Sequence, residues 1–333
     1  MANGPSTPEL AAAVSNAGGL GSIALAYLPA DAARAQLEAT RRLTDCPFAA
    51  NVFVLDEPSD VDVSTASSLL DPYRRELGLP APAPRRAPAV RLDDVLDLVL
   101  EHRPALLSFT FGALPSDRVA ALRECGILVA GTATTVREAE ELERKGVDVV
   151  VAQGAEAGGH RGTFLGDFED ALVGTVALVP PIADAVGTAV VAAGGIMDGR
   201  GIAAALALGA DAAQLGTAFV ACPESGAHPA HKRAVLGGTE ETTAVTRAFT
   251  GRHARGVRNR LVRDLEPHSD ALAPFPHQAV AAADVRAEAM RRGDPELMTM
   301  LAGQGLRLAR ELPAAELVAI LAAETEAALA RLD

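Results

Sequence analysis

Residues 189–220 read AVVAAGGIMDGRGIAAALALGADAAQLGTAFV. An apolar run of strand length, Ala189–Ala193, ends in two glycines, and a helical pattern over Gly201–Leu208 follows it. A second apolar run, Ala212–Val220, then begins. A strand, a glycine turn, a helix and another strand, in this order, are typical of a βα unit in a parallel sheet.

The same unit recurs towards the N-terminus. Helical patterns such as Ser116–Cys125 and Thr135–Lys145 follow apolar runs there. The runs show little alternation, which indicates strands buried on both faces. Together they predict most of a TIM (β/α)8-type barrel, which takes about 250 residues. The five further predicted strands are Ser22–Leu25, Phe48–Leu55, Ala105–Gly112, Ile127–Thr132 and Val147–Gln153.

The eighth strand of such a barrel has no counterpart in the sequence. The first predicted helix is Pro8–Ser15, capped by Thr7, and only Met1–Ser6 precedes it. A closed barrel needs a strand at this point, because two strand edges otherwise stay unpaired. We therefore expect that the first strand is truncated in this chain and that the chain starts internally.

The rest of the chain departs from the βα rhythm in two places. We predict the barrel over residues 1–220, with a helical and proline-rich excursion at 60–101 in which Gly78–Val90 leads back to the barrel. Residues 221–333 are predicted to form a mostly helical substrate or lid subdomain over the barrel mouth. Within it, Thr242–Phe249 reads as one more strand and Asp294–Leu332 as helix.

Composition excludes several classes of protein. Of the 333 residues, 49% are hydrophobic and 22% charged, so a disordered chain is excluded. The net charge of −13 is a poor match to a phosphate backbone, so no nucleic acid is expected as a partner. The arginine-rich run Arg247–Arg263 is instead interpreted as a solvated or subunit-contact surface, the latter compatible with a homo-oligomer.

Export signals, membrane segments and metal sites are also not expected. The uncharged stretch Leu10–Ala30 is broken by glycines, so no membrane span is predicted. The cysteines Cys46, Cys125 and Cys222 are far apart, which argues against disulfides and favours the cytoplasm. No pair of histidines or carboxylates has ligand spacing at the predicted strand ends, so no metal is expected.

Glycines at two successive strand ends indicate a phosphate site. Gly194 and Gly195 follow one strand, and Gly216 and Thr217 lie at the end of the next. In barrels this position binds phosphate through backbone N–H groups and a helix N-terminus. Either turn alone would also fit a site without a ligand. Because no GxxxxGK[ST] or GxGxxG is present, a mononucleotide such as FMN fits best.

A glycine-rich loop supplies the main candidate for catalysis. It runs over Val151–Phe164, VAQGAEAGGHRGTF, after a predicted strand. Gln153 can donate to and accept from a flavin edge, Gly158 gives the loop freedom, and His160 can act as a base or electrostatic partner. Asn51 is polar within an apolar strand and either satisfies the core or points to a ligand.

The assembled pattern resembles the nitronate monooxygenase family, formerly the 2-nitropropane dioxygenases. The resemblance rests on seven segments spread in order along the chain. AQGAEAGGHRG at 152–162 is the most discriminating of them. The others are MANGPSTPELAAAVSNAGGLG at 1–21, CPFAANVFV at 46–54, SFTFG at 108–112, AQLGTAF at 213–219 and AGQG at 302–305, with Gly194–Gly201 between the last two strands.

This resemblance implies an enzyme with an FMN-binding barrel and names its residues. His160 matches the family's catalytic histidine. The reaction implied is oxidation of an alkyl nitronate, such as propionate 3-nitronate, by dioxygen to a carbonyl compound and nitrite. The positions that match FMN contacts, taken with Gly194 of the glycine pair, are Asn51, Gln153, Gly158, Gly194, Gly195, Gln214, Leu215, Gly216 and Thr217.

Two departures and two alternatives accompany the resemblance. Met1 takes the place of the methionine that closes the family's first strand, and Leu301 stands where an aromatic residue is expected, so the aromatic part of the pocket should differ. An FMN-dependent NAD(P)H reductase of a quinone or enoyl thioester would share the barrel and a histidine loop. A flavin-binding protein without turnover is the other alternative.

Overall fold

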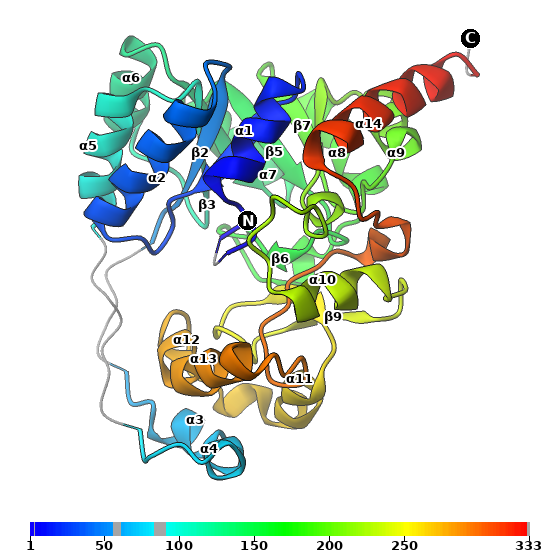
Figure 1. The fold of residues 1–333 in the computed structure, drawn as a ribbon. Helices are drawn as coiled ribbons and strands as arrows, with labels where there is room; N and C mark the ends of the chain where they lie inside the picture. The colour runs from blue at the N-terminus through cyan, green and yellow to red at the C-terminus, as the bar shows by residue number, and fades with distance from the viewer. Residues whose placement is uncertain (3, 56–60, 83–90, 332–333) are drawn as a thin grey trace.

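A parallel sheet of seven strands forms the centre of the computed structural model, which describes residues 1–2, 4–55, 61–82 and 91–331 (Figure 1). The strand order follows the chain, so that all carboxyl ends lie at one end of the sheet. This confirms the predicted (β/α)8-type architecture. The strands are β1 (Gly21–Ala24), β2 (Phe48–Phe53), β3 (Leu106–Thr110), β4 (Leu128–Ala133), β5 (Val149–Gln153), β7 (Ala189–Ala193) and β8 (Ala212–Gln214).

The last predicted strand, Ala212–Val220, is wrong in its second half. β8 ends at Gln214, and Thr217–Phe219 form a 3-10 turn instead. Among the residues that the structure describes, β8 pairs only with β7 and lies at the edge of the sheet, so no further strand extends the ladder there.

The barrel is open between β1 and β8. These two strands lie at opposite ends of the sheet order and, within the described residues, do not pair with each other. The interior still holds an apolar cluster of Ala130, Val151 and Ala193. At the amino end of β4, however, Leu128 is 51% exposed.

Helices cover the outside of the sheet and bury the main core against it. The Thr7 side chain accepts a hydrogen bond from Leu10 N at 3.0 Å and caps α1, as predicted. Leu37 of α2 and Leu142 of α7 are fully buried in this core. The helices of this layer are α1 (Pro8–Asn16), α2 (Ala30–Leu43), α5 (Leu92–His102), α6 (Ser116–Glu124), α7 (Val136–Lys145), α8 (Thr175–Ala185) and α9 (Gly199–Ala207).

The C-terminal helix does not lie over the barrel mouth. The predicted helical stretch Asp294–Leu332 contains a 3-10 turn at Gln304–Leu308 and the helix α14 (Ala314–Leu329). α14 packs against α9 and α1 on the outer wall (Figure 1), where its Leu317 and Leu321 are buried with Leu10. The expectation of a helical lid is therefore wrong for this segment.

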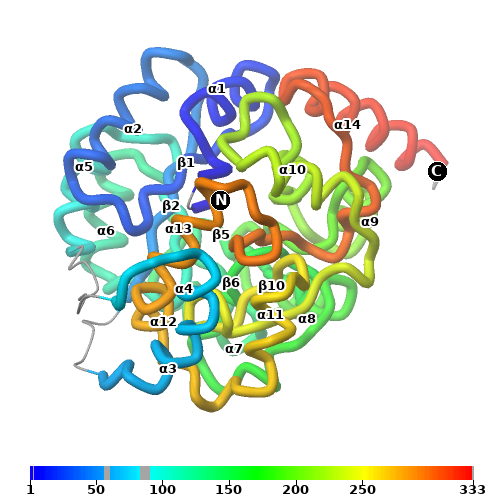
Figure 2. The backbone as a smooth tube through the Cα atoms, turned by 60° about the horizontal axis from the view of Figure 1, so that its bottom comes forward, coloured from blue at the N-terminus to red at the C-terminus, as the bar shows by residue number. Residues whose placement is uncertain are grey.

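A second core lies against the end of the barrel where the strands finish (Figures 1 and 2). It joins α3 (Ser64–Ser68) and α4 (Asp71–Leu77) to the chain after β8, so two helices of the predicted excursion belong to this second part. Most of Gly78–Val90 lies outside the described residues. The other helices of this part are α10 (Pro229–Leu236), α11 (Arg260–Leu265), α12 (His277–Ala281) and α13 (Ala283–Arg292).

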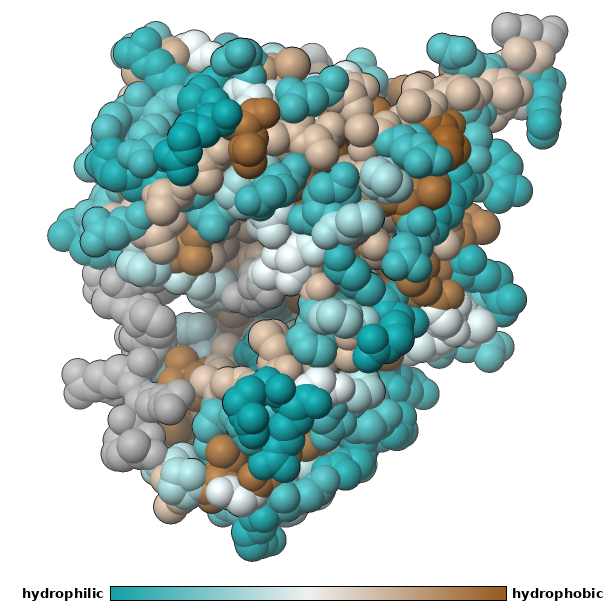
Figure 3. All heavy atoms as spheres, viewed as in Figure 1, coloured by the Kyte–Doolittle hydropathy of each residue, from teal (hydrophilic) through white to brown (hydrophobic). Residues whose placement is uncertain are grey.

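Polar contacts tie the excursion to the second part. Arg74 of α4 is 3% exposed and bonds Asp284 of α13, with Nε 2.8 Å from Oδ2. Tyr73 donates its hydroxyl to Asp264 at 3.0 Å. The face drawn in Figure 3 is mostly hydrophilic, with apolar side chains in scattered patches. None of the helices in the described ranges is long and apolar enough to span a bilayer.

Candidate active site

His160 lies in a short strand rather than in a flexible loop. β6 (Gly159–His160) pairs antiparallel with β10 (Ala254–Val257), which pairs in turn with β9 (Thr243–Thr246). In this register His160 faces Ala254. The β9–β10 hairpin therefore fixes the backbone of the glycine-rich segment.

The imidazole of His160 packs against three aromatic rings. Its ring centroid lies 5.5 Å from that of Phe111, 5.6 Å from Phe275 and 6.2 Å from Phe53, each with an edge-to-face orientation. Tyr27 packs edge-on against Phe53 at 5.2 Å. Edge-to-face pairs of this kind are favourable and hold their rings in place. An aromatic pocket thus forms without the residue at position 301.

The His160 imidazole is neutral. Burial, and then the positive charges of Arg252 and Arg286, lower its pKa from 6.5 to about 3. Its Nε2 lies 2.7 Å from Thr250 Oγ1. The imidazole is therefore a hydrogen-bonding group and a weak base at neutral pH, in a site with positive potential.

Arg252 contradicts our interpretation of the arginine-rich run as a surface. Its guanidinium lies 4.0 Å above the centroid of Phe111 and donates to Arg161 O at 3.2 Å. Arg255, 9% exposed, donates to Ala155 O at 3.0 Å. The interpretation holds for Arg258, which is exposed, and fails for these two, because the β9–β10 hairpin turns them towards the barrel.

Gln153 and Arg161 fasten the histidine segment to the end of β5. Gln153 donates Nε2 to His160 O at 3.0 Å and accepts at Oε1 from Gly162 N at 2.8 Å. Arg161, 1% exposed, donates to the carbonyl oxygens of Gln153, Gly154 and Ala171. Both side chains thereby position His160.

Asn51 lies on β2 one alternation before Phe53, so both side chains face the same side of the sheet. It donates Nδ2 to Ser108 Oγ at 2.8 Å. This bond satisfies its amide nitrogen without a ligand. The amide oxygen keeps its capacity to accept.

The glycine turns provide free amide donors. Gly194 and Gly195 have φ of +122° and +73°, which other residues rarely adopt. The N–H groups of Gly195 and Gly216 donate to no backbone acceptor of the described residues. Open donors at two adjacent strand ends suit a phosphate, so this part fits a mononucleotide.

The helix N-terminus expected beside this phosphate is already occupied. The first amides of α9 donate to carboxylates: Gly199 N to Glu324 Oε2 at 3.1 Å, and Gly201 N to Asp198 Oδ1 at 3.0 Å. An anion would meet these negative charges. The prediction of a helix N-terminus in the phosphate site is therefore wrong, and the glycine amides remain.

The segment at residues 302–305 brings three of the predicted positions together. A Cβ on Gly158 would lie 2.5 Å from Gly303 N, so Gly158 permits this close approach. Gly303 N donates to Thr217 Oγ1 at 2.9 Å. A Cβ on Gly305 would lie 2.7 Å from Gly195 O.

Gln214 and Leu215 lie apart from the aromatic pocket. Gln214 is exposed at the edge strand and pairs in register with Ala193, while Leu215 is half-buried against the outer core.

Several pocket residues escaped the sequence analysis. Phe53 could have been found from its alternation with Asn51 on one strand. Tyr27 and Phe111 adopt φ of +66° and +82°, strained conformations typical of functional sites. Nothing in the sequence marks these conformations. Arg286 and Phe275 lie in segments with no motif, and only the second core carries them to the barrel.

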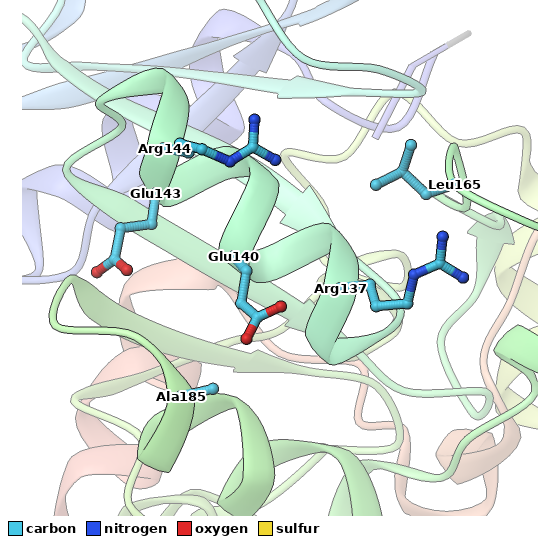
Figure 4. Close-up of a pocket in the computed structure, with 6 residues that line it drawn as sticks. All are labelled: Arg137, Glu140, Glu143, Arg144, Leu165 and Ala185. Atoms are coloured by element: carbon cyan, nitrogen blue, oxygen red, sulfur yellow. The ribbon is translucent and has the colours of Figure 1, made fainter.

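A groove elsewhere on the surface is larger than the pocket beside His160. An open groove of about 590 Å³ runs along the outer face of α7 and is lined by charges of both signs, including Arg137 and Glu140 (Figure 4). A smaller pocket of about 350 Å³ adjoins His160 through Arg252 and Phe275. Within the described residues, no group of three His, Cys, Asp or Glu could hold a metal ion.

Comparison with known proteins identifies the family. The family model described as nitronate monooxygenase matches residues 1–324. This chain belongs to the nitronate monooxygenase family. A nitronate monooxygenase of Pseudomonas aeruginosa is 48% identical, over 96% of this chain and 93% of that protein, and one of Paraburkholderia phytofirmans is 43% identical, over 99% and 92%.

Solved structures agree with this membership. A nitroalkane oxidase from Streptomyces ansochromogenes superposes with a TM-score of 0.93 at 43% identity, covering 100% of this chain and 96% of that one. FabK from Thermotoga maritima is more distant, with a TM-score of 0.78 at 31% identity, covering 100% and 92%. The nitronate monooxygenase family is flavin-dependent, and its members are oxidoreductases.

Proposed function

We propose that this chain oxidises alkyl nitronates with dioxygen to a carbonyl compound and nitrite, using FMN. One observation carries the proposal. A neutral His160 sits in an aromatic pocket beside two guanidinium groups, Arg252 and Arg286, neither of which is paired with a carboxylate of the described residues. Such a pocket favours a small anion over a neutral molecule.

The low pKa of His160 bears on which substrate form reacts. A base with a pKa of about 3 removes a carbon-bound proton poorly at neutral pH, so the neutral nitroalkane is disfavoured. A nitronate arrives already deprotonated. Since Nε2 is engaged with Thr250, Nδ1 is the ring nitrogen left to hydrogen-bond the nitronate.

Backbone amides at the glycine turns and two amide side chains would hold the cofactor. The free amides of Gly195 and Gly216 would hold the phosphate, with Gly194 and Thr217 beside them. When bound, FMN would take up the electron released by the nitronate and react with dioxygen. The flavin ring system would be hydrogen-bonded by Asn51 Oδ1 and by the lone pair and N–H that Gln153 keeps free.

The protein's own contribution is placement. The aromatic rings exclude water from the reacting carbon, and the two arginines concentrate the anion. The reacting carbon forms its carbonyl bond to an oxygen atom from dioxygen as the C–N bond breaks, and nitrite leaves as an anion. We also propose that the enzyme acts in the cytoplasm, which its three free cysteines support.

The test is nitrite release in air from propyl-1-nitronate and from propionate 3-nitronate, without NADH, by the wild type and by His160→Ala. Nitrite release that falls at least 100-fold in the variant, whose visible flavin spectrum stays unchanged, would support the proposal. A yellow protein that ignores both nitronates but is bleached by NADH without oxygen would move it to the reductases. Flavin binding without either reaction would leave a binding protein.

A further inference from the structure

Besides Nε of Arg161, two polar atoms near His160 lack partners among the described residues. The hydroxyl of Tyr27 is buried and hydrogen-bonds to no atom of the described residues, and the same holds for Nε of Arg286. No carboxylate of the described chain lies within 4 Å of the Arg286 guanidinium. By contrast, Arg74 in the same subdomain is paired with Asp284 and Asp71.

Such an arrangement is unfavourable unless something completes it. A buried donor without an acceptor pays its full desolvation cost, and a guanidinium without a counter-charge does so to a greater degree. Arg252 adds a second positive charge nearby, since both arginines act on the titration of His160 and of Tyr27. An acceptor that carries negative charge would satisfy all three groups.

The aromatic wall sets where this acceptor would lie. Tyr27 packs against Phe53 and Phe275, with the ring centroids 5.2 Å and 6.0 Å away. His160 packs against the same two rings. Tyr27 and His160 therefore line the same aromatic wall, along which a substrate of a few carbons can extend.

We propose that Arg286 and Tyr27 bind a carboxylate at the far end of the substrate and so decide which nitronate is preferred. The guanidinium fork matches the two oxygens of a carboxylate, and the tyrosine hydroxyl adds a third donor. This inference rests on the proposed function, because it places the nitronate end at His160. Arg286 is then a specificity residue and takes no part in the oxidation.

The kinetic test compares two substrates that differ in their far end. Propionate 3-nitronate carries a carboxylate there and propyl-1-nitronate a methyl group. For Arg286→Met we expect KM for propionate 3-nitronate to rise roughly 10-fold to 100-fold, as for loss of hydrogen bonds to a charged group, with kcat nearly unchanged. KM for propyl-1-nitronate should rise by a much smaller factor, because Arg286 contributes only its general attraction for the anion there, and Arg286→Lys should recover part of the loss.

Two further variants separate the role of this pair from a general effect. Tyr27→Phe removes one hydroxyl and should raise KM for the carboxylated substrate alone, by a smaller factor. Arg258→Met removes an exposed arginine of the neighbouring segment and should change neither constant. Equal changes on both substrates in Arg286→Met and in Tyr27→Phe would overturn the proposal. Nitrite from neither substrate in the wild type would instead contradict the proposed function.

A binding measurement reports on the pair without turnover. Succinate has the length of propionate 3-nitronate with a carboxylate in place of the nitronate, and butyrate lacks the second charge. Calorimetric titration of the flavin-loaded wild type should give tighter binding of succinate, and Arg286→Met should remove the difference. Equal affinity of the wild type for the two acids would refute the site. Should Arg286→Met fail to fold, Tyr27→Phe carries both tests.

Discussion

The neutrality of His160 makes a prediction about stability. Its pKa is lowered to about 3 in the folded chain, chiefly by burial, whereas an unfolded histidine has its ordinary value near 6.5. Between these two values the unfolded chain binds a proton that the folded chain does not. Stability therefore falls as the pH falls from about 6.5 towards 3, and is fully present above 6.5.

The size of the effect follows from the difference between the folded and unfolded pKa values. Each pH unit between them changes the free energy of unfolding by about 1.4 kcal/mol, so the full difference amounts to about 5 kcal/mol. This is an upper bound, because the residue as a whole is only half-buried. The variant His160→Gln cannot titrate, so its stability should lack this component. As the pH falls, the unfolding free energy of the wild type should drop relative to that of the variant by about 1 kcal/mol per pH unit.

Urea unfolding at pH 7, 6, 5 and 4.5, followed by circular dichroism with FMN in fixed excess, measures this difference. A constant offset between the curves is allowed, because the variant changes the bond to Thr250. Only the slope against pH is the test. A difference that does not vary with pH would show that His160 titrates normally in the fold, and a slope of opposite sign would show that it is held as a cation. Either result would refute the reasoning.

Three further changes test the packing of the site. Gly158→Ala places a Cβ 2.5 Å from Gly303 N and should lower stability by about 1 to 3 kcal/mol in thermal unfolding. The control is Gly187→Ala, which should change stability little because its Cβ would meet only Glu143 Oε1, at 3.5 Å. Arg74→Met leaves Asp284 without its partner and should lower stability by about 3 kcal/mol. Adding Asp284→Asn should recover part of this loss in a double-mutant cycle, and simple additivity of the two changes would disprove the coupling. Arg252→Met should raise the pKa of His160, seen by NMR of the ring, and an unchanged pKa would remove this arginine from the electrostatics of the site.

The sequence by itself determined the barrel and the order of its parts. Apolar runs buried on both faces allow little besides parallel strands, so β1 to β5 and β7 were predicted to within two residues at each end, whereas the short β6 was predicted as a loop. β8 was predicted too long, because its end depends on a neighbouring strand and not on its own residues. Thr7 as a cap was predictable because a cap is a local hydrogen bond.

The residues of the site fall into the same two groups, those recognisable from the sequence and those that only tertiary packing brings there. Residues within motifs, such as His160, Gln153 and Gly158, were recognisable because glycine and polar residues are unusual at strand ends. What surrounds His160 was not, since Phe275 and Arg286 reach it only through the second core. The protonation state of His160 was equally hidden, because burial and the charges of Arg252 and Arg286 arise when distant segments pack together. Local sequence therefore determined where the reactive group stands, and the tertiary structure decided its charge and its neighbours.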